Sequence, residues 1–185
     1  SVADAKMRIF NKDGSEGLAG GNAIRCVGKY LYEKGIVPRR DMRIETARGV
    51  NEVKVYSFSG KVNSASVNLG KAELAGEKIP CIWKEDRIVG KPVTIGGKDY
   101  KITLVNIGNP HCVVFSEKVD AVDLGTVGPE FENCEYFPER INAEFIRVVN
   151  KVTIKMRVWE RGNGETWSCG TGAAAAVVAA VLGGY

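Results

Sequence analysis

The sequence has a single histidine, His111, among its 185 residues, and none of its five cysteines belongs to a C-x-x-C pair. One histidine and separated cysteines do not form a zinc-finger ligand set, so we expect no metal site. The cysteine count is odd and no signal-peptide pattern is present, which argues against a secreted disulfide framework. We therefore expect a reducing, cytoplasmic setting.

Long apolar runs and basic stripes are also missing. The longest small-apolar run, residues 173–182, is about half of what crosses a bilayer. The 26 basic and 22 acidic residues leave a net charge of +4 with no cluster of one sign. We expect no membrane segment and no nucleic-acid partner. Apolar residues at 44% and charged residues at 26% are typical of a soluble globular protein.

Strand-like patterns outnumber helical ones. Glycine-rich loops fall at 17–21 and 161–172. We expect helices at 22–34, 124–133 and 173–182, and strands at 6–11, within 37–48, and at 52–58, 61–69, 79–83, 92–95, 100–107, 111–116, 143–149 and 152–159. Because strands and helices do not alternate regularly, the pattern predicts an α+β fold rather than a parallel α/β sheet.

The chain contains an internal repeat. Residues 6–11, K-M-R-I-F-N, match residues 155–160, K-M-R-V-W-E, at an offset of 149 positions. Carried forward without gaps, this offset aligns the two glycine-rich loops and places Gly20 on Cys169. We interpret the repeat as two halves built alike, each with a strand, a glycine-rich loop and a helix; a coincidence between two such units is the alternative.

Each glycine-rich loop leads into the start of a helix. The N–H groups and partial positive charge there bind anions such as carboxylates, so two such helix starts facing one cleft would hold a small acidic molecule. The same field lowers the pKa of a cysteine at the helix start. Cys169 alone among the cysteines has this position, which makes it the candidate catalytic residue, whereas its counterpart is Gly20. The remaining cysteines, expected in the core, are Cys26, Cys81, Cys112 and Cys134.

Several motifs together resemble the diaminopimelate epimerases. They are N-x-D-G-S-E at 11–16, G-N-A-I-R-C at 21–26, N-I-G-N-P-H-C-V-V-F at 106–115, F-P-E-R-x-N-x-E-F at 137–145 and W-E-R-G-x-G-E-T-x-x-C-G-T-G at 159–172. Each motif alone is weak, but their combination is specific and covers nearly the whole chain. The resemblance implies two pseudo-symmetric halves, each a curved, mostly antiparallel sheet wrapped around a central helix, with the active site between them. Residues 1–72 would belong to the N-terminal half and 73–185 to the C-terminal half.

The resemblance also implies a reaction. This family of isomerases interconverts LL- and meso-diaminopimelate without a cofactor, on the route to lysine and peptidoglycan. Two cysteines, one from each half, act as base and acid on opposite faces of the α-carbon. By correspondence, Cys169 is catalytic, and His111 and Glu160 tune the cysteine pKa values. The corresponding substrate-binding residues are Asn11, Gly21, Asn22, Asn109, Asn142, Glu160, Arg161, Gly170 and Thr171.

The sequence departs from the family pattern in two respects. Gly20 stands where the family has its other catalytic cysteine, and family chains extend beyond both ends of this one. We therefore expect a truncated chain with impaired epimerisation, diaminopimelate as its small-molecule partner and, as a further expectation, a homodimer. Two alternatives stay open: a non-catalytic binder of an amino acid or dicarboxylate, and a related racemase of the same fold, such as a relative of proline racemase.

Overall fold

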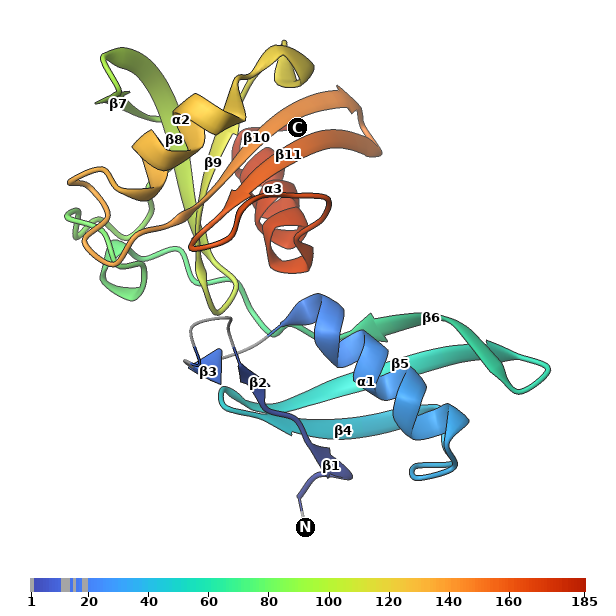
Figure 1. The fold of residues 1–185 in the computed structure, drawn as a ribbon. Helices are drawn as coiled ribbons and strands as arrows, with labels where there is room; N and C mark the ends of the chain where they lie inside the picture. The colour runs from blue at the N-terminus through green and yellow to red at the C-terminus, as the bar shows by residue number, and fades with distance from the viewer. Residues whose placement is uncertain (1, 11–13, 15, 18–19) are drawn as a thin grey trace. The chain divides into compact units, whose positions relative to one another are not determined.

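The structure is a computed structural model that describes residues 2–10, 14, 16–17 and 20–185. The chain divides into two compact units, Ser1–Gly70 and Lys71–Tyr185 (Figure 1). Each unit has its own apolar core. The boundary that we expect between the two family halves, at 72/73, stays a prediction. None of the helices in the described ranges is long and apolar enough to cross a bilayer.

The first unit is a small sheet packed against one helix. Its elements are β1 (Ala5–Lys6), β2 (Ile9–Phe10), β3 (Glu16–Gly17), α1 (Gly21–Glu33), β4 (Asp41–Thr46), β5 (Gly49–Phe58) and β6 (Lys61–Val67). The sheet has the order β1-β4-β5-β6 and is antiparallel except for the β1–β4 pair, while β2 and β3 form a separate ladder. α1 buries Ile24, Gly28 and Leu31 on the side that packs on β5 and β6.

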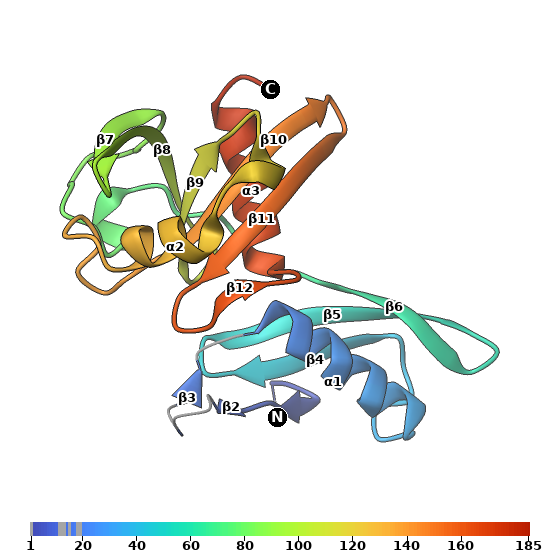
Figure 2. The same cartoon turned by 45° about the horizontal axis from the view of Figure 1, so that its top comes forward.

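The second unit is a six-stranded sheet with a helix on each face. Its elements are η1 (Gly76–Lys78), β7 (Lys91–Ile95), β8 (Lys98–Asn106), β9 (Pro110–Phe115), η2 (Val119–Ala121), α2 (Leu124–Glu132), β10 (Asn142–Asn150), β11 (Thr153–Glu160), β12 (Gly164–Thr166) and α3 (Gly170–Leu182). The order is β12-β11-β10-β9-β8-β7, antiparallel except for β9–β10. α2 packs on β10, β11 and β12, and α3 packs on β8 to β11 (Figure 2).

The alternation of side chains along β9 and β10 separates an apolar face from a polar one. Cys112 and Phe145 point into the core cluster that includes α2 residues. Their neighbours His111 and Glu144 point to the opposite face, because successive side chains of a strand alternate. The parallel register pairs Asn142 with His111 and thereby brings the polar residues of both strands together.

The internal repeat is confirmed in three dimensions. α1 and α3 both have 13 residues and are related by the same offset of 149 positions. The β2–β3 ladder pairs Ile9 with Gly17, and the β11–β12 ladder pairs Val158 with Thr166, again at that offset. Ion pairs repeat as well: Arg8 binds Glu16 at 2.9 Å, and Arg157 binds Glu165 at 2.9 Å. The two copies therefore share local geometry and not only sequence.

The α+β class and the three helices are confirmed, although α3 starts at Gly170 rather than at residue 173. The strand predicted at 79–83 is wrong. Ile79 and Cys81 are buried in the core cluster, but their segment bonds as a loop, with the N–H of Ile82 donating to the carbonyl of Tyr136. The prediction that Cys26 lies in the core is also wrong, because its side chain is exposed on α1.

Candidate active site

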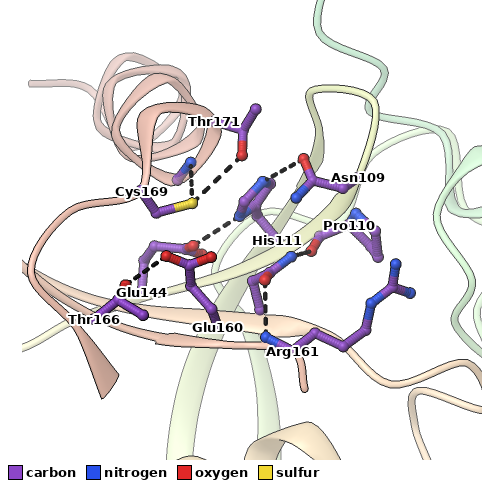
Figure 3. Close-up of polar contacts among 11 residues, drawn as sticks. Asn109, Pro110, His111, Glu144, Glu160, Arg161, Thr166, Cys169 and Thr171 are labelled. Atoms are coloured by element: carbon purple, nitrogen blue, oxygen red, sulfur yellow. Dashed lines mark hydrogen bonds and ion pairs between the residues drawn. The ribbon is translucent and has the colours of Figure 1, made fainter. Parts of the chain in front are cut away.

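Cys169 is the N-cap of α3, as its position after the glycine-rich loop predicts. Its backbone is extended (φ −126°, ψ 114°), and its Sγ accepts a hydrogen bond from the N–H of Gly172 at 3.4 Å. The Thr171 hydroxyl lies 3.4 Å from the same sulfur (Figure 3). The side chain is only 8% exposed. The sulfur therefore accepts a hydrogen bond from one of the N–H groups that have no partner within the helix at its start.

The environment of Cys169 favours the thiol over the thiolate. Burial raises the pKa of Cys169, and the charges of Glu160 and Glu144 raise it further. Hydrogen bonds from Thr171 and Gly172 act in the opposite direction but do not outweigh burial. The expectation that the helix start gives this cysteine a lowered pKa is wrong for this unit by itself, because desolvation by burial is the largest influence and the two carboxylates add to it.

His111 is fully buried beneath the start of α3. Its Nδ1 lies 2.7 Å from Glu144 Oε1, and its Nε2 lies 3.0 Å from Asn109 Oδ1. Asn109 lies just before β9 and Glu144 lies near the start of β10. Figure 3 shows the three side chains close together. The histidine ring is thus fixed at both nitrogens, which suits a group that acts on nearby protons.

Asn142 ties two predicted segments of the site together. Its Nδ2 donates to the carbonyl of Pro110 at 2.7 Å, and its Oδ1 accepts from the N–H of Arg161 at 2.9 Å. The turn that carries Asn109 and His111 is thereby fixed to the end of β11, where Glu160 and Arg161 lie. Asn142 is buried, and both ends of its amide bind backbone groups.

Glu160 and Arg161 are held by separate contacts. The Thr166 hydroxyl, on β12, donates to the Glu160 carboxylate. The Arg161 guanidinium donates to the carbonyl of Glu139 at 3.0 Å and lies away from Cys169 (Figure 3). The following residue is fixed too, because Glu132 of α2 accepts from the N–H of Gly162 at 2.8 Å. α2 therefore supports the turn from the face of the sheet opposite α3.

The predicted site residues of the first unit gather at the start of α1. Gly20 is its N-cap with extended backbone (φ −144°, ψ 103°), and its carbonyl accepts from the N–H of Ile24. Gly21 and Asn22 form the first turn, where both receive hydrogen bonds from Arg25. Gly20 thus occupies the same N-cap geometry as Cys169 but carries no side chain. Asn11 lies outside the described residues.

Sequence reasoning missed Glu144, Thr166 and Glu132 as residues that support the site. Glu144 and Thr166 both stand in the motifs at 137–145 and 159–172, and Glu144 is also the only acidic residue in the otherwise apolar run 143–146. Glu132 has no such signal, since its contacts join separate elements. Within the described part of the chain, no three His, Cys, Asp or Glu side chains gather as a metal site would require.

Two solved structures share this fold. A hydroxyproline epimerase from Agrobacterium vitis superposes with a TM-score of 0.69 at 18% identity. The match covers 99% of this chain and 57% of the hydroxyproline epimerase chain. A probable proline racemase from Agrobacterium radiobacter gives a TM-score of 0.66 at 17% identity, over 98% and 56%. At these identities the likeness shows the fold alone, and the predicted fold class is confirmed.

Sequence comparisons identify the family. The diaminopimelate epimerase family model matches residues 1–75 and 103–185. The diaminopimelate epimerase of Pelotomaculum thermopropionicum is 51% identical over 99% of this chain, and that of Methanococcus maripaludis is 45% identical over 100%. The chain belongs to the diaminopimelate epimerase family. It spans 65% and 66% of the length of these two relatives.

Proposed function

We propose that the chain is part of an epimerase that acts on diaminopimelate, with Cys169 exchanging the α-proton on one face. The observation that carries this proposal is a buried thiol at the N-cap of α3, surrounded by His111, Glu144 and Glu160. Family membership supports the isomerase class and the substrate. The five cysteines are free thiols, which supports a cytoplasmic location, and a homodimer stays a prediction.

The proposed step is a proton transfer without a cofactor. The Cys169 thiolate takes the α-proton, so that the C–H bond breaks and an S–H bond forms. The electron pair left on carbon delocalises into the substrate carboxylate, whose growing charge the N–H groups at the start of α3 would stabilise. Because Cys169 favours the thiol, it also suits the reverse direction, in which it returns a proton to the carbanion.

Inversion needs a second group on the opposite face of the carbon. The family pattern places a cysteine at position 20, and Gly20 has no group that can hold a proton. We infer that this chain exchanges the α-proton on one face and epimerises poorly. The proposed substrate contacts remain Asn11, Gly21, Asn22, Asn109, Asn142, Gly170, Thr171, Glu160 and Arg161. For Asn142 the contacts with Pro110 and Arg161 support a positioning role in addition.

Deuterium exchange tests the proposal directly. The protein is incubated with each stereoisomer of diaminopimelate in deuterated water, and α-deuterium is followed by mass spectrometry and chiral separation. We expect deuterium to enter one stereoisomer with little epimer formed, and Cys169→Ala to abolish the exchange. Full epimerisation by the unmodified chain would contradict the impairment, and equal exchange by Cys169→Ala would contradict the role of the thiol.

Gly20→Cys is the complementary variant. A Cβ on Gly20 would lie 2.9 Å from Cδ1 of Ile9, the mobile end of a side chain, and its φ suits any residue. The new thiol therefore fits after a small shift of Ile9. We expect this variant to form epimer in addition to exchanging the proton. If it exchanges on one face only, the remaining part of the site is incomplete in this chain.

The absent thiol also favours a second candidate function, a non-catalytic binder that keeps the helix-start anion sites. Calorimetry with diaminopimelate distinguishes the two. Binding without any α-proton exchange would favour the binder, whereas exchange would exclude it. Replacing diaminopimelate by proline in the same exchange experiment tests the related racemase reaction, because proline lacks the second amino-acid group of diaminopimelate.

A further inference from the structure

A buried acid–base pair lies beneath the start of α3. Glu144 Oε1 and His111 Nδ1 are 2.7 Å apart, and both side chains are 0% exposed. They come from the parallel strands β10 and β9, on the face of the sheet opposite the main apolar core. Burying a charged carboxylate costs several kcal/mol of free energy unless a partner compensates for the lost water. A buried pair at this place therefore indicates a role other than packing.

The two partners of the His111 ring both present oxygen atoms to it. An amide oxygen only accepts hydrogen bonds, and so does an ionised carboxylate. Asn109 Oδ1 lies 3.0 Å from Nε2 and Glu144 Oε1 lies 2.7 Å from Nδ1, so each ring nitrogen that carries a proton can donate it to the oxygen that it faces. The arrangement sets a carboxylate against Nδ1 and a neutral amide oxygen against Nε2. The carboxylate is the stronger of the two acceptors, since charge-assisted hydrogen bonds are roughly twice as strong.

Glu144 also approaches the catalytic turn itself. A Cβ placed on Gly172 would lie 2.6 Å from Glu144 Oε1 and 3.3 Å from Cys169 Sγ, so a glycine at this position lets carboxylate and sulfur converge. The other oxygen, Oε2, is buried and has no hydrogen-bond partner among the described residues. The carboxylate is therefore held in place by His111 and by the close approach of α3.

We propose that Glu144 is a positioning residue that retains the Nδ1 proton of His111, so that the ring exchanges protons only through Nε2. The titratable groups around this pair are Cys169 at the start of α3, Glu160 on β11 and Cys112 on β9. All three are acids that carry no positive charge. The carboxylate that lies within hydrogen-bond distance of Nδ1, at 2.7 Å, is that of Glu144. The link to catalysis rests on the proposed function; the proton assignment does not.

The single histidine makes a direct measurement feasible. Long-range ¹H–¹⁵N spectra of the unmodified 185-residue chain contain one imidazole, so the two ring nitrogens are assigned without ambiguity. Across a pH titration we expect Nδ1 to stay protonated and only Nε2 to lose its proton. A neutral ring protonated at Nε2, or a fast mixture of both tautomers, would overturn the proposal without any variant.

Variants separate the charge from the packing. In Glu144→Gln the amide can accept or donate, so we expect the neutral ring to populate the Nε2–H tautomer as well. Glu144→Asp keeps the carboxylate and should restore Nδ1–H. Glu132→Gln is the matched control, a buried carboxylate of the same unit that binds Trp159 and Gly162 instead of His111. If the control changes the tautomer as much as Glu144→Gln does, the effect is structural and the proposal fails.

Activity provides the second readout. In the α-proton exchange reaction we expect Glu144→Gln to lower the maximal rate by about 100-fold with little change in half-saturation, since acid–base contributions are of this order. Glu144→Asp should recover most of the rate. Unchanged exchange in Glu144→Gln would overturn the link to catalysis. If the unmodified chain shows no exchange at all, the proposed function fails, and the tautomer measurement still decides the role of Glu144.

Discussion

At the scale of single residues, the reactivity of Cys169 results from opposing influences. The helix start and the Thr171 hydroxyl stabilise a thiolate, whereas burial and the charges of Glu160 and Glu144 oppose it, and the net effect is a raised pKa for Cys169. The raised pKa of Cys169 favours the protonated thiol in the absence of substrate. Any positive charge or substrate ammonium group brought to these carboxylates would favour the thiolate.

Replacing Glu160 by Gln should make Cys169 more nucleophilic. The variant removes one negative charge near the sulfur and keeps an oxygen that can accept from Thr166, so the pKa of Cys169 moves down from its raised position. We expect alkylation by iodoacetamide near neutral pH to become roughly two- to tenfold faster. Peptide mass spectrometry measures the rate at Cys169, with the exposed Cys26 as an internal reference.

Glu165→Gln is the matched control for this prediction. Glu165 lies on the same β-hairpin, is exposed and pairs with Arg157. It is not among the groups that shift the pKa of Cys169. The control should leave the alkylation rate of Cys169 unchanged. Equal acceleration in both variants would show that Glu160 has no specific effect on the thiol.

How much the sequence predicts depends on whether a feature is local. The place of Cys169 follows from the glycine loop and helix pattern around it, and the structure confirms both the helix and the N-cap. The partnership of His111 with Glu144 depends on the register between two parallel strands, which no local pattern specifies. The direction of the Cys169 pKa shift depends on burial and on carboxylates from other strands, so local helix physics alone gives the wrong sign.

At the scale of elements, α2 supports the site through close backbone approach. A Cβ on Gly128 would lie 2.2 Å from Cδ2 of Trp159, so glycine lets the helix rest on the indole. The indole N–H donates to Glu132 at 2.7 Å, and the same carboxylate accepts from the N–H of Gly162. The helix thus braces Trp159, the residue just before Glu160, on the outer face of the sheet.

Gly128→Ala should destabilise the second unit. Overpacking of this kind costs about 1–3 kcal/mol, because either Trp159 or α2 must move. Gly125→Ala on the same helix is the matched control: its Cβ would meet only Asp123 Oδ1 at 3.6 Å, an ordinary contact. We expect this control to be neutral or to stabilise by about 0.5–1 kcal/mol, the usual helix gain of Ala over Gly. Urea unfolding followed by circular dichroism measures both, and equal effects would contradict the close approach.

At the scale of the whole chain, the two units differ in the groups whose pKa values folding shifts. In residues 71–185, burial raises the pKa values of four cysteines, which are Cys81, Cys112, Cys134 and Cys169, while a hydrogen bond from Lys155 lowers the pKa of one carboxylate, Asp120. In residues 1–70, hydrogen bonds lower the pKa values of three carboxylates, which are Asp4, Glu16 and Glu33. The units also have separate apolar cores. Each unit should therefore respond to pH in its own way.

The second unit should lose stability first in alkali. A buried thiol keeps its proton in the folded state, while the unfolded chain releases it above a pH of about 8.5, so the free energy of unfolding falls as the pH rises from there toward the raised pKa values. The lowered carboxylate pKa values of the first unit affect its stability in acid instead. Their contribution to the free energy of unfolding is complete above the pKa values of the unfolded chain and is lost as the pH falls. Hydrogen exchange followed by mass spectrometry at pH 7 and at about pH 9.5, corrected for the intrinsic rate, measures the two units separately.

Cys112→Ala tests the cause, since burial raises the pKa of Cys112 well above its usual range. This variant should be less stable at pH 7 because a buried group is removed, yet its stability should decline less steeply with rising pH. An unchanged slope in Cys112→Ala, or equal alkaline loss of protection in both units, would contradict the assignment of this behaviour to buried thiols.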